Sequence, residues 1–325
     1  MSHDAPTHSP LARWARTVGV FSVQLLIVAI VLHRLMSLPT PVALNLFVAA
    51  LVGSVAAILL ALGSYVAIWR DGRAGTLSAS IGLVLGAAII AWPVGLVPLY
   101  RRLPAIHDVT TDPAVPPAFV ALAAQRVGGA NSADYAGTEI ARLQVEAYPD
   151  IRPILITRAV NETWEVLGTT VRRLGWRVVS ETPPGGRSRP GFIEAVDRTL
   201  VLGFTDDVVI RIEGDSRETR VDVRSASRFG EHDFGRNASR IRGLLKDLET
   251  RLRETVSGSE GPQRRVKATA AVPKRGKGAL ALKPGQQRKQ GRGQPGSRRE
   301  PQPKGTPPGR GEDRARGKQP QRSQQ

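Results

Sequence analysis

The stretch that decides the fold is residues 205–228, TDDVVIRIEGDSRETRVDVRSASR. Apolar and polar side chains alternate along 207–213 and again along 219–225, the pattern of two half-buried β-strands. Asp215 and Ser216 stand between the two runs and favour a turn, so the stretch predicts an antiparallel hairpin. We expect its charged face to be a solvated sheet surface with cross-strand ion pairs; an anion- or peptide-binding face is the alternative. The side chains of that face are Arg211, Glu213, Arg220, Asp222 and Arg224.

Further strands and two helices are predicted around this hairpin. Apolar residues recur at spacings of three and four along 160–174 and 234–252, which is typical of helices with one apolar face. The predicted order is β-α-β-β-β-β-α, and the fold class is α+β, a mostly antiparallel sheet with helices on one face. The remaining predictions are strands at 154–156, 176–180 and 192–197, a proline-rich loop at 104–117, a short helix at 118–126, and loop or helix at 131–144.

Three long apolar segments precede this domain, at about residues 18–38, 42–68 and 77–99. A helix needs about 20 apolar residues to cross the bilayer core, so each segment predicts a transmembrane helix. Because no ionisable side chain lies deep in these segments, they are expected to anchor the protein and not to conduct or transport. A cleaved signal peptide is the alternative for the first segment, but no small-residue cleavage site follows it.

Charge divides the chain into three parts. The 325 residues carry a formal net charge of +18 and include no cysteine, which excludes disulfides and thiolate metal sites. Residues 1–103 carry a net charge of +5, residues 104–255 of −1, and residues 256–325 of +14. We predict a membrane anchor, a soluble domain and a tail with these bounds.

The tail, 256–325, is mostly Arg, Lys, Gly, Pro, Gln and Ser and contains no aromatic residue. Such a composition cannot bury a core, so we expect disorder. A solvated tail without a partner is one interpretation. The other is nonspecific attraction to an anionic lipid or an envelope polymer. Nucleic acid is a partner only if the tail lies in the cytoplasm.

The arginines that flank the three segments favour one orientation. Four arginines lie on one side of the predicted membrane and three on the other, and the side with more basic residues is usually cytoplasmic. The count therefore predicts a multi-pass protein of a bacterial inner (cell) membrane, with its soluble domain in the periplasm. The first group is Arg13, Arg16, Arg70 and Arg73, and the second is Arg34, Arg101 and Arg102.

Two clusters of polar residues are candidate binding sites. In the first, a histidine and two carboxylates can hold a ligand or a divalent ion; the alternative is that Asp and Thr satisfy backbone groups of a turn. In the second, two arginines and two hydroxyls near a helix start can hold a phosphate or carboxylate; the alternative is that the arginines pair with nearby aspartates and Asp233 caps the helix. The candidates are His107, Asp108, Thr110, Thr111 and Asp112, and then Arg224, Ser225, Ser227, Arg228 and Asp233.

Several phrases resemble a bacterial family of domains of unknown function, number fourteen ninety-nine. They are IHDVTTDP at 106–113, AYPDI at 147–151, GFTDDV at 203–208 and DVRSASRFG at 222–230, in this order. The resemblance covers roughly residues 104–250 and implies a membrane-anchored or exported bacterial domain. It implies no reaction, and the basic tail is outside it.

Three functions follow as hypotheses. The first is a non-enzymatic envelope protein whose soluble domain binds an unknown ligand or a membrane-protein partner, with the tail adding nonspecific attraction. The second is an enzyme that uses His107, Asp108 and Asp112, with or without a divalent metal. The third is a cytoplasmic domain whose tail binds nucleic acid. No catalytic motif assigns a reaction, and we expect no cofactor and no resident metal.

Overall fold

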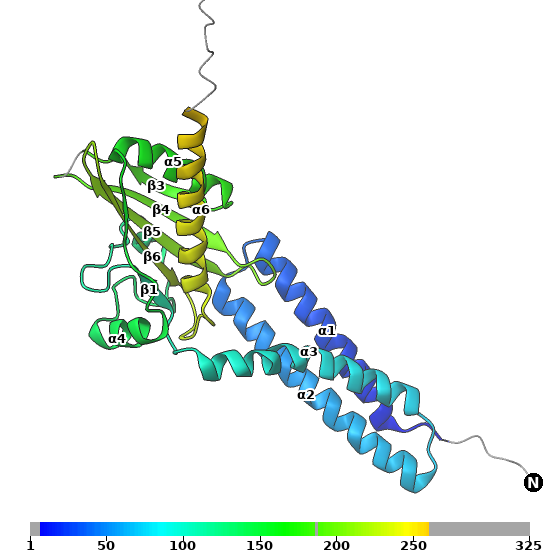
Figure 1. The fold of residues 1–325 in the computed structure, drawn as a ribbon. Coiled ribbons are helices and arrows are strands. Elements are labelled where there is room, and N and C mark those ends of the chain that lie inside the picture. Colours follow the sequence, from blue (N-terminus) through cyan, green and yellow to red (C-terminus); the bar gives the residue numbers. More distant parts are fainter. Residues whose placement is uncertain (1–6, 186–187, 260–325) are drawn as a thin grey trace, which may run out of the picture. The chain divides into compact units, whose positions relative to one another are not determined.

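The computed structural model describes residues 7–185 and 188–259 (Figure 1). The predicted basic tail lies outside the described residues from position 260 onward, so its disorder and its partners stay predictions.

Three helices form the N-terminal part: α1 (Pro10–Leu35), α2 (Thr40–Asp71) and α3 (Thr76–Arg102). Each is long and apolar enough to cross a membrane. Helix α1 begins eight residues before the predicted span, where Pro10 occupies its first turn. It ends at Leu35, so Met36 and Leu38, which the predicted span included, lie beyond the helix.

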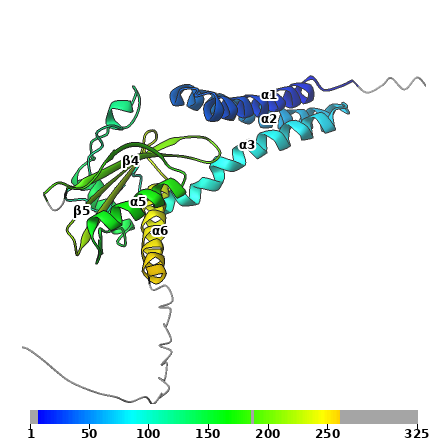
Figure 2. The same cartoon turned by 90° about the horizontal axis from the view of Figure 1, so that it is seen from above.

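Small residues let α3 pack closely against the other two helices (Figure 2). A Cβ atom at Gly82 would lie 2.5 Å from the backbone of Ala15 in α1. A Cβ atom at Gly86 would lie 2.7 Å from the carbonyl oxygen of Ser54 in α2. Glycines four residues apart thus give α3 two points of close backbone approach, a common device between membrane helices.

The strands of the domain that follows these helices form one antiparallel sheet. Its strand order is β1-β6-β5-β4-β3, and β2 pairs with a further part of β6. From β2 to α6 the elements follow the predicted order β-α-β-β-β-β-α, so the α+β prediction is confirmed. The strands are β1 (Asp108–Thr110), β2 (Ile154–Ile156), β3 (Arg177–Thr182), β4 (Gly191–Arg198), β5 (Thr205–Gly214) and β6 (Thr219–Ser227).

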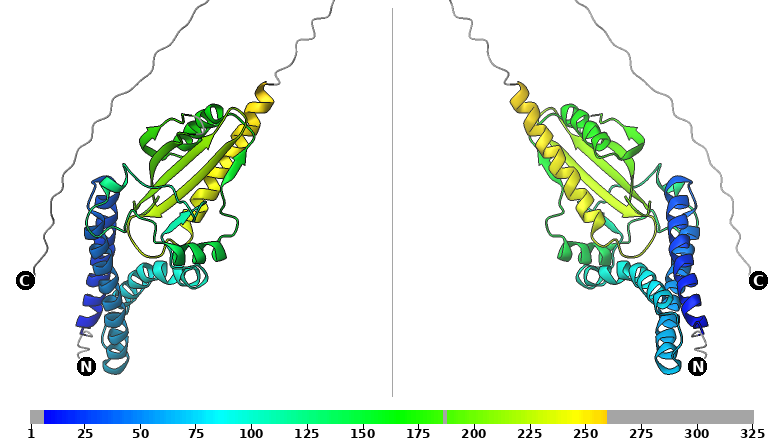
Figure 3. Two further views of the ribbon diagram at one scale, coloured as in Figure 1. Left: turned by 90° about the vertical axis from the view of Figure 1, so that its left-hand side faces the viewer. Right: turned by 90° about the vertical axis from the view of Figure 1, so that its right-hand side faces the viewer.

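Two helices, α5 (Val160–Arg173) and α6 (Arg236–Ser259), cover one face of the sheet (Figures 1 and 3). The apolar side of the hairpin faces them as its alternation predicted. Ile210 lies opposite Val223 and Ile212 opposite Val221, and all four are fully buried. This layer is the main hydrophobic core of the domain.

The other face of the sheet is partly covered by the irregular segment that leaves β1. Phe119 and Leu122 pack there on side chains of β4, β5 and β6. The predicted ion pair between Arg211 and Asp222 is present at 2.8 Å. The expectation that this face is solvated is wrong for Asp222 and Arg224, which are 0% and 2% exposed.

Short elements account for the other differences from prediction. The loop predicted at 104–117 contains β1, and the helix predicted at 118–126 is only the single turn η1 (Ala123–Gln125). Helix α4 (Thr138–Ala147) falls where loop or helix was expected. Strand β1 and the turn η1 have only three residues each, too few to show a periodic pattern in the sequence.

Candidate functional site

The two predicted clusters meet in the structure, at the junction of β1, β6 and the start of α6. Asp108 of β1 and Arg224 of β6 form a two-bond ion pair, with 2.7 Å between Nη2 and Oδ2. Both residues are 2% exposed. The Arg224 guanidinium also donates to the carbonyl oxygens of Pro117 and Ala133. The guanidinium therefore donates to groups inside the protein, and these bonds connect the irregular segment after β1 to the sheet.

The other polar residues of the first cluster also bond within the fold. The backbone of Thr110 exchanges two hydrogen bonds with the Gln144 side chain of α4. The Thr111 hydroxyl accepts from the amide of Val223 at 2.9 Å. Asp112 accepts from two arginines of the hairpin, Arg211 at 3.2 Å and Arg220 at 2.7 Å.

His107 is half-buried at the same junction. Its carbonyl oxygen accepts from the Ser227 amide and from Asn237 Nδ2. Burial lowers the pKa of its imidazole below the ordinary 6.5, and the nearby Arg126 charge acts in the same direction, while Asp108 opposes both. Within residues 7–185 and 188–259, no group of three or more His, Asp or Glu side chains is placed to hold a metal ion.

In the second cluster, the two arginines point to different carboxylates. Arg224 reaches Asp108, whereas Arg228 pairs with Asp207 at 2.7 Å. Asp207 also pairs with Arg126 at 3.0 Å. Burial raises the pKa of the Asp207 carboxyl, and the two arginines act against that shift. The structure therefore does not bring Arg224 and Arg228 together around one anion.

Ser225 belongs to a buried polar network at the base of α6. Its hydroxyl donates to Asn237 Oδ1 at 2.8 Å and accepts from Arg240 Nη1 at 3.0 Å. Arg240 in turn pairs with Asp206 at 2.5 Å and with Asp197 at 2.8 Å. The network joins α6 to β4, β5 and β6.

Asp233 caps α6, as the sequence suggested. Its two carboxylate oxygens accept from the amides of Gly235 at 2.7 Å and Asn237 at 2.8 Å. Burial raises the pKa of this carboxyl, and the two amides act in the opposite direction. Together with Ser227, Asp233 also faces a cavity, so these two predicted residues lie where a ligand has room.

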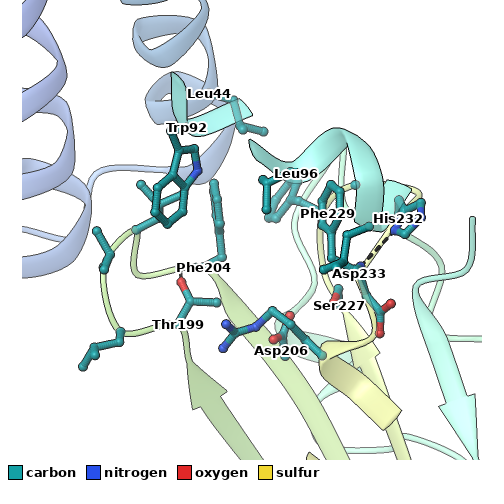
Figure 4. Close-up of a pocket in the computed structure, with 17 residues that line it drawn as sticks. Leu44, Trp92, Leu96, Thr199, Phe204, Asp206, Ser227, Phe229, His232 and Asp233 are labelled. Carbon is teal, nitrogen blue, oxygen red and sulfur yellow. Dashed lines mark hydrogen bonds between the residues drawn. The ribbon is translucent and has the colours of Figure 1, made fainter. Parts of the chain in front are cut away.

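That cavity measures about 520 Å³ and lies between α2, α3 and the membrane-side end of the sheet (Figure 4). One wall is apolar and comes from the helices and from the β4–β5 loop, residues 199–204. The apolar side chains from these two sources are Leu44, Trp92, Leu96, Leu99, Leu200, Val201, Leu202 and Phe204.

The opposite wall surrounds the start of α6; it carries the polar side chains of the cavity beside Phe229 and Phe234, and we call it the polar wall. Asp206, Ser227 and Asp233 lie on it (Figure 4). His232 lies beside them and accepts from the Phe234 amide through Nδ1 at 2.9 Å. Arg236 completes this wall, and its exposed guanidinium makes no ion pair with any residue that the structure describes.

The sequence clusters missed most of this cavity. Trp92 lies in the segment 77–99, which the sequence analysis interpreted only as a membrane span. The run Leu200–Val201–Leu202 was a usable signal, because three successive apolar residues in a predicted loop are uncommon. Nothing in the sequence around Leu44 or Leu96 indicates that they line a cavity, because this depends on where α2 and α3 contact the domain.

A comparison with family models supports the resemblance in the sequence. The model described as "Protein of unknown function (DUF1499)" matches residues 108–248. No curated protein and no solved structure matches the chain. The matched segment begins with β1 and ends within α6, so it includes the whole sheet. The domain that follows the three apolar helices therefore belongs to the DUF1499 family of unknown function.

Proposed function

We propose that this protein is an integral membrane protein whose DUF1499 domain binds an amphiphilic membrane ligand in the cavity between α2, α3 and the sheet. One observation carries the proposal: a single cavity has an apolar wall built partly from membrane-capable helices and a polar wall built from the start of α6. Its size falls in the range of about 300–1,000 Å³ that is usual for small-molecule sites.

The level of the cavity fits a lipid-like ligand. Leu44 lies one turn inside the start of α2, and Trp92, Leu96 and Leu99 lie toward the end of α3. Both positions are at the end of the helices from which the chain enters the soluble domain. Exposed Trp side chains are common at this depth, where headgroups meet acyl chains. An acyl chain can therefore contact the apolar wall while its headgroup meets the polar wall.

The charges on the polar wall favour an anionic headgroup. The Asp206 carboxylate is neutralised by Arg240 at 2.5 Å. The Asp233 carboxylate is bonded to two amides of the α6 cap. Arg236 is the one cation on this wall, and no described carboxylate lies within ion-pair distance of it. A phosphate group would supply the missing counter-charge.

Lipid retention tests both parts of the proposal. The full-length protein is reconstituted with equal amounts of phosphatidylglycerol and phosphatidylcholine, purified, and its retained lipid is identified by native mass spectrometry. Leu96→Trp fills the cavity and should abolish retention of either lipid. Val84→Trp, on an exposed position of the same helix, is the matched control and should retain lipid like the wild type. Equal retention by the two variants would refute the cavity as the binding site.

The headgroup is tested separately. Arg236→Gln should reduce the preference for phosphatidylglycerol toward parity, because it removes the unpaired cation. Arg177→Gln, at an exposed position of β3, should leave the preference unchanged. If the wild type retains both lipids equally, the anionic headgroup is wrong while the cavity proposal stands.

Location belongs to the same proposal. We place the helices in a bacterial inner (cell) membrane and the soluble domain in the periplasm, with a membrane part at 1–103, a soluble domain at 104–255 and a tail at 256–325. The support is the four-to-three excess of arginines at the end of the bundle away from the domain. The tail, with its net charge of +14, would add attraction to anionic lipid or envelope polymer.

A further inference from the structure

The β4–β5 loop exposes two neighbouring apolar side chains. Leu200 is 82% exposed, more than any other large apolar side chain in the described residues of the soluble domain, and Val201 is 54% exposed. Hydrogen bonds within the loop nevertheless close it between Thr199 and Phe204. Thr199 and Phe204 bond to each other through their backbones at 2.8 Å, and the Thr199 hydroxyl accepts from the Phe204 amide at 2.8 Å. Leu200 and Val201 therefore project from a loop whose ends are joined by hydrogen bonds.

The β4–β5 loop contacts the end of α1. His33 Nδ1 and the carbonyl oxygen of Leu202 are 2.6 Å apart, and Phe204 packs on the His33 and Phe47 rings at centroid distances of 5.5 and 6.2 Å. Gly203 has a φ of +76°, and a Cβ atom there would lie 3.3 Å from Arg34 Cα. Only glycine suits both the backbone conformation and the close approach.

The attachment point is the end of α1, a helix long and apolar enough to cross a membrane. Helix α1 ends two residues after His33, and its last residue, Leu35, and the following Met36 are 75% and 70% exposed apolar side chains. Two cations flank the loop. Arg198 donates to the carbonyl oxygens of Gly203 and His33, and Arg34 makes no ion pair with any described residue. Apolar side chains between arginines are typical of a surface at the headgroup level.

We propose that Leu200 and Val201 insert into the bilayer that the three helices span, so that the β4–β5 loop is a second membrane contact of the soluble domain. The partner is the lipid surface itself. The argument rests on the exposure of the pair and on its attachment to α1, and it is independent of any ligand in the cavity.

Single cysteines test this directly, because the natural chain contains none. Leu200→Cys and, separately, Val201→Cys are labelled with a fluorophore in the full-length protein and reconstituted in phosphatidylcholine–phosphatidylglycerol vesicles. Lipids with a nitroxide on the acyl chain should quench both labels strongly, and aqueous iodide should quench them weakly. Leu155→Cys is the matched control, because Leu155 is 68% exposed on β2; its label should show the opposite pattern.

A nitroxide lipid bound in the cavity could also quench these labels, so the measurement is repeated with Leu96→Trp. Quenching that persists when the cavity is filled identifies the bilayer as the quencher and supports insertion. Quenching that disappears assigns the effect to the cavity ligand and overturns insertion. Iodide access at positions 200 and 201 equal to that at position 155 also overturns it. Two label positions keep the test decisive if one variant fails to fold.

Discussion

At the scale of single residues, the buried pair of Asp108 and Arg224 has the largest predicted effect on stability. Both side chains are 2% exposed and are 2.7 Å apart. Asp108→Ala leaves the Arg224 charge buried without its carboxylate, which costs about 3–5 kcal/mol. Urea unfolding of the full-length protein in detergent micelles, followed by circular dichroism, measures the loss.

The matched control is an exposed pair in the same domain. Arg242 and Asp150 are bonded at 2.6 Å, but their side chains are 43% and 55% exposed. Asp150→Ala should therefore cost less than about 1 kcal/mol, because water and salt screen an exposed pair. Similar losses for the two variants would contradict a special role for the buried pair. The double variant Asp108→Ala with Arg224→Met should regain part of the loss, since no buried charge is then left unpaired.

His107 gives the domain a pH-dependent stability. Burial lowers the pKa of its imidazole below 6.5 in the folded state, so the unfolded chain takes up a proton first as the pH falls. The contribution of neutral His107 is present above about pH 6.5 and is lost as the pH falls through the lowered pKa. Between about pH 7.5 and pH 5, the unfolding temperature of the wild type should fall further than that of His107→Gln. Parallel decreases would show that other groups cause the dependence.

The separation of two partners in the sequence decides whether their contact could be predicted. The Asp233 cap was predictable, because the cap and the amides it binds lie within four residues. The pairing of Arg224 with Asp108 was not, because 116 residues separate the partners. The sequence offered Asp206, Asp207 and Asp222 as nearer carboxylates, and only the tertiary fold decides among them.

At the scale of elements, Glu194 of β4 fixes the irregular segment that covers the outer face of the sheet. Its carboxylate accepts from three successive amides, Val120 at 3.1 Å, Ala121 at 2.9 Å and Leu122 at 2.8 Å. Glu194→Gln replaces one accepting oxygen with a donor and should cost about 1.5–3 kcal/mol. Hydrogen exchange measured by mass spectrometry should rise about tenfold or more in peptides of residues 116–126.

Helix α5 provides the internal comparison for this experiment. It packs on the other face of the sheet, so its peptides should exchange at wild-type rates in Glu194→Gln. Equal acceleration in α5 would mean that the variant destabilises the whole domain and does not release one segment.

The elements also mark the limit of sequence prediction. Strands β3 to β6 and helices α5 and α6 were predictable, because apolar side chains recur along each of them with a regular period. Strand β2 was predicted only from its three successive apolar residues, Ile154–Ile156. The alternation of residues 207–213 even identified the buried face of β5 correctly. Strand β1 has three residues and takes its conformation from pairing with β6, so no local pattern could reveal it. The outer face looked solvated because the segment that covers it has no period of its own.

At the scale of the whole molecule, the cavity combines residues from position 44 to position 236. It exists because the end of α3, the start of α2, the β4–β5 loop and the start of α6 meet. Each piece has an ordinary local explanation: a membrane span, a turn or a cap. The sequence therefore predicted the pieces and two of the lining residues, Ser227 and Asp233, but not their common cavity.

The side of the membrane that the soluble domain occupies decides which ligands it can meet. Alkaline phosphatase is active only after export, and a fluorescent protein fused to an inner-membrane protein fluoresces only in the cytoplasm. Fusions after residue 257 should give phosphatase activity without fluorescence, because the larger arginine group lies at the opposite end of the helices. Fusions after Gly72, in the turn between α2 and α3, should give the reverse and serve as the internal control.

Fluorescence after residue 257 would instead place the domain and the +14 tail beside the inner leaflet and nucleic acid. The cavity would then draw its ligand from the cytoplasmic leaflet, where anionic lipids attract the same basic tail.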